Sequence, residues 1–135
     1  MKNTTLFLLL ILFLAPLVLP AQQLSDQQTA GLPELEEHHG RNYLLLILAV
    51  DRNEPRVFDL HLDLSVRWDQ IERRRIVPVD ILPPRRDVRA LARWFGMEDK
   101  DFAVVLLNKE GEVIFRATET NVLLPIMELV DRDSR

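Results

Sequence analysis

The sequence has 135 residues, the usual length of one domain, with no cysteine and a formal net charge of −4 at pH 7. Thiol–disulfide and cysteine-peroxidase chemistry are excluded because they need a thiolate. The acidic balance argues against nucleic-acid binding, since proteins that bind nucleic acids present basic surfaces.

Residues 1–21 are predicted to be a signal peptide. Lys2 is the only charged residue of this stretch, residues 6–19 are almost wholly apolar, and Ala21 precedes polar sequence. A membrane anchor is the alternative, but the apolar run is shorter than the roughly 20 residues that cross a bilayer, and Pro16 interrupts it. We expect cleavage near Ala21, export to a periplasm or the extracellular space, and no membrane span after cleavage.

Residues 22–40 are expected to form a mobile leader, followed by a domain at 41–135. The first part of the leader is polar, with four glutamines. Residues 32–39 have the composition of a short helix that ends at Gly40.

The first half of the domain predicts a strand, a helix and a second strand. Residues 43–50 form a continuous apolar run, which is typical of a strand buried on both faces. Residues 55–74 show both strand and helix spacing, and we favour a helix, with Asn53 as its N-cap, because parallel strands need a long crossover. Residues 76–82 predict the second strand, and Pro78 places it at a sheet edge or a strand start.

The second half predicts a helix, a hairpin and a final helix. The helix covers 87–95, the hairpin strands cover 102–107 and 112–117 around a turn at 108–111, and the last helix covers 122–130. The order β-α-β-α-β-β-α predicts a single α/β domain of thioredoxin-like layout.

The least interrupted apolar runs predict the core. Four residues are expected in neighbouring central strands, with the first strand parallel to the second: Leu46, Leu48, Val105 and Leu107. Trp68 and Phe95 are expected to cover the sheet from the two crossover helices. Leu62 is expected to lie off the buried face of its helix.

Three segments resemble a known family. Arg41 precedes an apolar strand that ends at Asp51, basic residues precede the second strand, and a polar turn joins two later strands: Arg41, 44–50, Asp51, Arg74, Arg75, 102–107, Asn108–Lys109–Glu110–Gly111 and 112–116. Over residues 41–130 the chain resembles the P-DUDES domain. That thioredoxin-like domain occurs in exported bacterial proteins and in vertebrate extracellular proteins of the sushi-repeat and equarin kind.

The resemblance implies an exported domain, similar in shape to peroxiredoxins, whose chemistry is not established. The chain departs from the family pattern at Asn108, where the family usually has glycine, and at 127–132, which lacks a Met-Pro-Met-Arg-like stretch. The family supplies no agreed catalytic residue.

Polar residues follow the first strand at the position where thioredoxins carry their active site. Asp51, Arg52 and Glu54 therefore form a candidate binding site, since strand ends of α/β sheets face binding crevices. The alternative is helix capping and a solvated turn. A cofactor-independent enzyme that uses these residues, or an accessory subunit of an envelope assembly, is the rival to a non-catalytic binding module.

The second candidate binding site is a group of basic residues. Arg86, Arg89 and Arg93 are spaced to share a helix face that could hold an anionic extracytoplasmic partner or another protein. The alternative is a solvated outer face.

No cofactor or metal is expected. Adjacent His38 and His39 point in different directions and lack a third ligand, and His61 is predicted to be remote and alone. No phosphate-binding glycine loop occurs, and no serine lies near a His–Asp arrangement.

Overall fold

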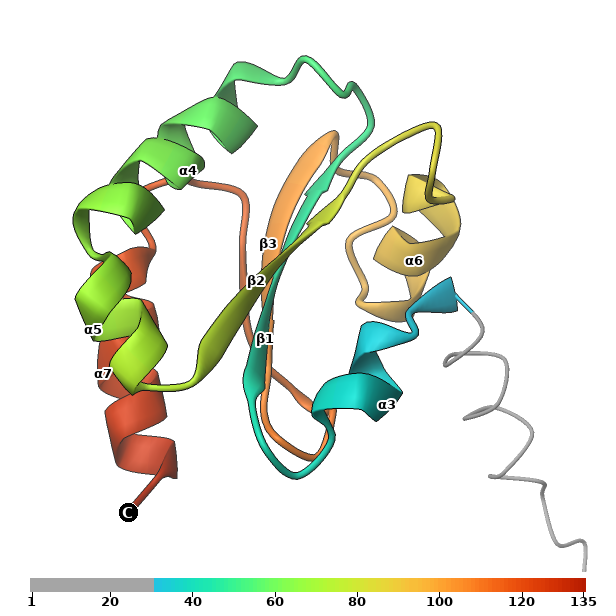
Figure 1. Cartoon of the computed structure of the whole chain (residues 1–135). Helices are drawn as coiled ribbons and strands as arrows, with labels where there is room; N and C mark the ends of the chain where they lie inside the picture. The colour runs from blue at the N-terminus through green and yellow to red at the C-terminus, as the bar shows by residue number, and fades with distance from the viewer. Residues whose placement is uncertain (1–30) are drawn as a thin grey trace, which may run out of the picture.

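The structure, a computed structural model, describes residues 31–135 and places them in three layers. The predicted signal peptide and the first part of the predicted leader lie outside the described residues. Figure 1 shows a central sheet seen nearly edge-on, with α4, α5 and α7 on one side and α3 and α6 on the other. The fold is mixed α/β, as predicted.

The sheet has four strands in the order β2-β1-β3-β4. β1 (Tyr43–Ala49) is parallel to β2 (Ile76–Ile81) and antiparallel to β3 (Phe102–Leu107), which is antiparallel to β4 (Val113–Ala117). The predicted parallel pairing of the first two strands and the edge position of the strand containing Pro78 are confirmed.

The two central strands are buried along their whole length because helices cover both faces. Successive side chains alternate between two cores: Leu45 and Ile47 face the side of α4, α5 and α7, whereas Leu46 and Leu48 face α6. Leu46 pairs with Val105 across the sheet, and Leu107 pairs with Leu44. The predicted central residues are confirmed.

The crossover from β1 to β2 is helical, but it is two helices: α4 (Pro55–Val66) and α5 (Trp68–Arg73). The break lies at Arg67, whose φ of −106° and ψ of 16° leave the helical region. This break makes the expectation for Trp68 wrong, because it turns the indole outward to 45% exposure while the fully buried Ile71 covers the sheet. Leu62 is exposed, as predicted.

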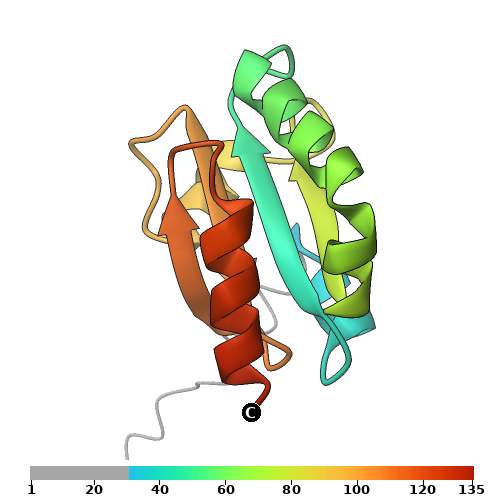
Figure 2. The same cartoon turned by 90° about the vertical axis from the view of Figure 1, so that its left-hand side faces the viewer.

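The remaining helices have clear sequence causes. α6 (Val88–Trp94) begins after Asp87, whose carboxylate accepts a hydrogen bond from the Ala90 amide, and it buries Phe95 just beyond its end, as predicted. α7 (Leu123–Asp133) packs beside α4 and α5 on the same face, as Figure 2 shows. Arg74 fixes this arrangement with two hydrogen bonds to the Asp131 carboxylate, at 2.9 and 3.0 Å.

Residues 31–40, which were expected to belong to a mobile leader, pack against the domain. Leu32 is fully buried in the core under α6, and α3 (Glu34–His38) follows it before Gly40 at a φ of 73°. The short helix expected at 32–39 is therefore present. Within residues 31–135, no helix has the length and apolar character needed to cross a membrane.

Candidate functional site

A pocket of about 560 Å³ lies where the parallel strands β1 and β2 end. Arg52 reaches it from the loop after β1, Asp80 from the end of β2, and Arg85 from the loop after β2. Leu82, Pro83 and Pro84 supply apolar walls. Because the carboxyl ends of parallel strands meet at one edge, residues 28 or more positions apart in sequence come together here. We name this cavity the arginine pocket.

Four charged residues line this pocket: Arg52, Asp80, Arg85 and Arg86. Arg86 is paired with Glu34 and Asp80 with His61, so Arg52 and Arg85 are its unpaired cations within the described part of the chain. Both are exposed, and neither forms an ion pair with a carboxylate of residues 31–135. A guanidinium group presents a planar set of donors that matches a carboxylate or a phosphate. The pocket therefore offers two donor sets, from two different loops, to one anionic group.

His61 and Asp80 form a pair at the border of the arginine pocket. The Nε2 atom of His61, on α4, lies 2.8 and 2.9 Å from the two oxygens of the Asp80 carboxylate. Both side chains are partly exposed. The expectation that His61 is remote and alone is wrong, because the tertiary fold brings α4 over the end of β2.

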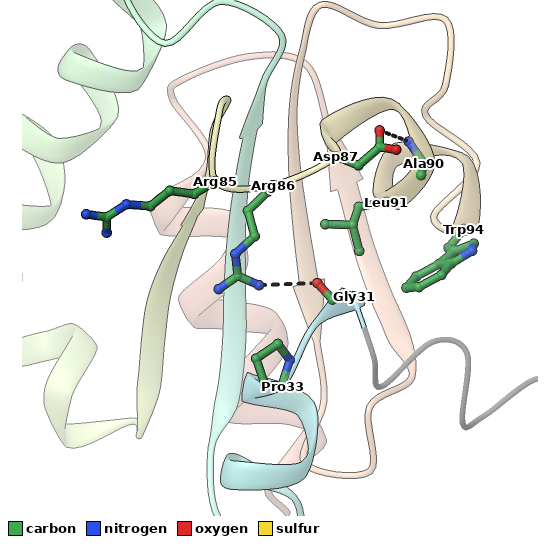
Figure 3. Close-up of a pocket in the computed structure, with 8 residues that line it drawn as sticks. All are labelled: Gly31, Pro33, Arg85, Arg86, Asp87, Ala90, Leu91 and Trp94. Atoms are coloured by element: carbon green, nitrogen blue, oxygen red, sulfur yellow. Dashed lines mark hydrogen bonds between the residues drawn. The ribbon is translucent and has the colours of Figure 1, made fainter.

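A second pocket of about 540 Å³ lies on the α6 side of the same loop, and Figure 3 shows its lining residues. Trp94, Leu91 and Pro33 make it mainly apolar. Arg85 and Arg86 line both pockets, and Figure 3 shows their side chains pointing in different directions.

Arg86 holds the N-terminal segment on the domain. Its guanidinium group pairs with the Glu34 carboxylate and donates to the Gly31 carbonyl at 3.2 Å (Figure 3). Burial by itself would raise the pKa of Glu34, but the hydrogen bond and charge of Arg86 leave that pKa lowered. Arg86 is therefore a partly buried structural contact, and its charge is already balanced.

Asp51 and Glu54 do not face the arginine pocket with Arg52. The Asp51 carboxylate accepts from the Asn53 amide at 2.9 Å, and Glu54 pairs with Arg56 at 2.7 Å. The hydrogen bond from Arg56 lowers the pKa of Glu54. Glu54 also accepts from the Arg56 amide and is the N-cap of α4, so the prediction of Asn53 as N-cap is wrong by one residue.

The predicted arginine face is not a single helix face. Arg86 precedes the N-cap Asp87 and points to Glu34, because α6 begins only at Val88. Arg89 pairs with Asp101 at 3.2 Å and donates to the Glu98 carbonyl. Arg93 is exposed on α6. The structure therefore removes Arg86 from the predicted group, whereas Arg89 and Arg93 lie four positions apart on α6.

The sequence did not predict that Asp80 and Arg85 share a pocket with Arg52, or that His61 contacts Asp80. Arg85 sits after a double proline at the end of a predicted strand, which is a signal for a strand-end loop. The pairing of His61 with Asp80 had no sequence signal, because it depends on the rotation of α4.

Metal coordination has no geometric basis in the part of the chain that the structure describes, where no three His, Asp or Glu side chains gather into a set. Comparison with family models gives no match, and comparison with curated proteins gives none either.

Proposed function

We propose that the chain is an exported, non-catalytic binding module of thioredoxin-like fold and P-DUDES type. The element order after residue 42 and the sheet order β2-β1-β3-β4, with β3 antiparallel to the other strands, support the fold assignment. The N-terminal apolar run supports export. The segments around Asp51 and Gly111 support the family resemblance.

The binding site of this module is the arginine pocket, and its ligand carries a carboxylate or a phosphate. The observation that carries this proposal is that Arg52 and Arg85, from separate loops, line one cavity and form no ion pair within residues 31–135. The carboxylate of the cavity, Asp80, lies at hydrogen-bond distance from His61. Its volume is in the range of small-ligand sites, about 300–1,000 Å³. Two guanidinium groups on one anion give charge-assisted hydrogen bonds with fixed geometry.

The geometry gives less support to the rival hypothesis that the chain is a cofactor-independent enzyme. Catalysis by Asp51 and Glu54 would need carboxylates free to exchange protons with a substrate. Both carboxylates instead accept hydrogen bonds within their own loop, and the pKa of Glu54 is lowered by Arg56. These contacts favour a structural role for the two acids and leave Arg52 as the member of the trio that meets the pocket.

The test is a nuclear magnetic resonance titration of the protein with inorganic phosphate and, separately, with acetate. We expect saturable shifts of the Nε–Hε signals of Arg52 and Arg85, with weak affinity of about millimolar Kd because the site is open to water. The Arg52→Gln and Arg85→Gln double variant should lose the saturation.

Arg93→Gln is the matched control, because Arg93 is an exposed arginine on α6 outside the pocket. It should leave the titration unchanged. Shifts that persist in the double variant, or an absence of saturation with both anions, would refute the proposed function.

A further inference from the structure

The outer face of α4 carries three apolar side chains that no element of residues 31–135 covers. Phe58, Leu62 and Val66 are 66%, 52% and 82% exposed, in contrast to the buried inner residues of the same helix. Their spacing of four residues places them in one row, about 12 Å long at 1.5 Å per residue. We name this row the α4 ridge.

The α4 ridge is continuous with the arginine pocket through His61. Phe58 lies one helical turn from His61 on the surface of α4, and His61 contacts Asp80, which lines the pocket. A ligand that enters the pocket and extends along α4 would therefore meet the ridge next.

The charges beside the α4 ridge favour a protein partner over a membrane surface. Arg56 and Arg67 are paired with Glu54 and Asp63, whereas Asp59 forms no ion pair within residues 31–135. An anionic lipid surface placed against α4 would face the Asp59 carboxylate, and repulsion between the like charges disfavours membrane binding. The positive charge is concentrated at one end, in the arginine pocket.

We infer that the α4 ridge and the arginine pocket together form a docking surface for a protein segment whose apolar side chains lie along α4 and whose carboxylates enter the pocket. This inference rests on the proposed anion site and names its partner class. Apolar contact supplies the area, and the two arginines set the direction of the segment.

The experiment selects peptides of about 12 residues, enough for three helical turns, from a random displayed library against the purified protein. We expect enriched peptides that combine apolar residues at helical spacing with acidic residues near one end. Synthetic versions, measured by fluorescence anisotropy, should bind about tenfold more weakly to the Phe58→Gln and Leu62→Gln double variant and to the Arg52→Gln and Arg85→Gln double variant.

Leu124→Gln is the matched control, since Leu124 is 56% exposed on α7, outside the ridge, and its change should alter affinity by less than about twofold. All these residues are exposed, so circular dichroism should show folded variants. If the arginine variant lowers peptide affinity but the ridge variant does not, this inference is overturned and the proposed function is still supported. The inference is also overturned if the ridge variant lowers peptide affinity but the arginine variant does not, or if the selection enriches no peptides.

Two further measurements test whether something other than a protein segment covers the α4 ridge. A concentration-dependent dimer in sedimentation that the ridge variant abolishes would show that a second copy covers α4. Co-sedimentation with phosphatidylcholine and phosphatidylglycerol vesicles, lost in the ridge variant, would show a lipid surface. Either result overturns the assignment of a protein segment.

Discussion

Tyr43, the only tyrosine of the chain, joins the start of β1 to the end of α7. Its hydroxyl donates to the Asp133 carboxylate at 2.7 Å, and the Lys109 ammonium lies 5.6 Å from its ring centre. Burial, followed by the hydrogen bond and charge of Asp133, raises the pKa of Tyr43 to about 12. The neutral phenol is therefore part of the folded state.

We predict that Tyr43 ionises at a higher pH than a free tyrosine does. Its ionisation therefore makes the free energy of unfolding depend on pH in the alkaline range. The unfolded pKa is about 10, so the stability that the neutral phenol contributes is complete below about pH 10 and is lost as the pH rises towards 12. The ultraviolet absorbance of tyrosinate measures the ionisation directly, because there is one tyrosine. Tyr43→Phe should remove this part of the pH dependence, and ionisation near pH 10 in protein that is still folded by circular dichroism would contradict the prediction.

At the scale of elements, α4 separates a buried face from an exposed one. Leu60 is fully buried against the sheet, whereas Leu62 is half-exposed two residues later. The helical period explains the difference, since two positions on a helix differ by about 200° in direction.

We predict unequal costs for the same truncation at these two positions. Leu60→Ala should lower the free energy of unfolding by about 2–5 kcal/mol, because it removes buried surface and leaves a cavity. Leu62→Ala should cost less than about 0.5 kcal/mol, as expected of surface positions. Urea denaturation of both variants at one pH is the measurement, and equal losses would show that the face of α4 is assigned wrongly.

The hairpin between β3 and β4 depends on Gly111. Its φ of 83° lies in the left-handed region, and the Asn108 side chain accepts hydrogen bonds from the Glu110 and Glu112 amides to close the turn. Asn108 therefore has a structural role in this turn.

We predict that Gly111→Ala destabilises the domain by about 1–2 kcal/mol, since a Cβ atom is disfavoured in this conformation. Gly111→Asn should cost less, because asparagine tolerates the left-handed region. The added Cβ would lie 3.4 Å from Leu35, an ordinary contact, so crowding does not explain a loss. Thermal unfolding of the two variants tests this order, and the reverse order would contradict it.

At the scale of the whole molecule, export remains a prediction from the N-terminal sequence. When the full chain is expressed in a bacterium, the protein recovered from outside the cytoplasm should begin near Gln22, because a short apolar run followed by Ala21 directs cleavage there. Mass spectrometry of the intact protein gives the N-terminus. Cytosolic protein that retains Met1 would contradict the prediction.

The whole molecule also shows why the domain needs no disulfide. The described residues bury two apolar cores, one on each face of the sheet, and contain no buried side-chain polar atom without a hydrogen-bond partner. Burial of apolar side chains on both faces of the sheet therefore stabilises the domain without a disulfide.

The sequence was sufficient to predict most of the elements and the two central strands, because apolar periodicity and turn residues act locally. The run at 43–50, the prolines around 83 and Gly111 each mark an element end within a few residues of its observed place. It also determined the absence of thiol chemistry, since no cysteine occurs.

Which polar residues meet depends on the tertiary fold. Spacing grouped Asp51 with Arg52, and Arg86 with Arg93, but side-chain direction depends on where each helix begins and how it rotates on the sheet. The break at Arg67 exposed Trp68, and the parallel pairing of β1 and β2 brought Arg52 to Arg85. Such contacts join residues far apart in the chain, and no local pattern records them.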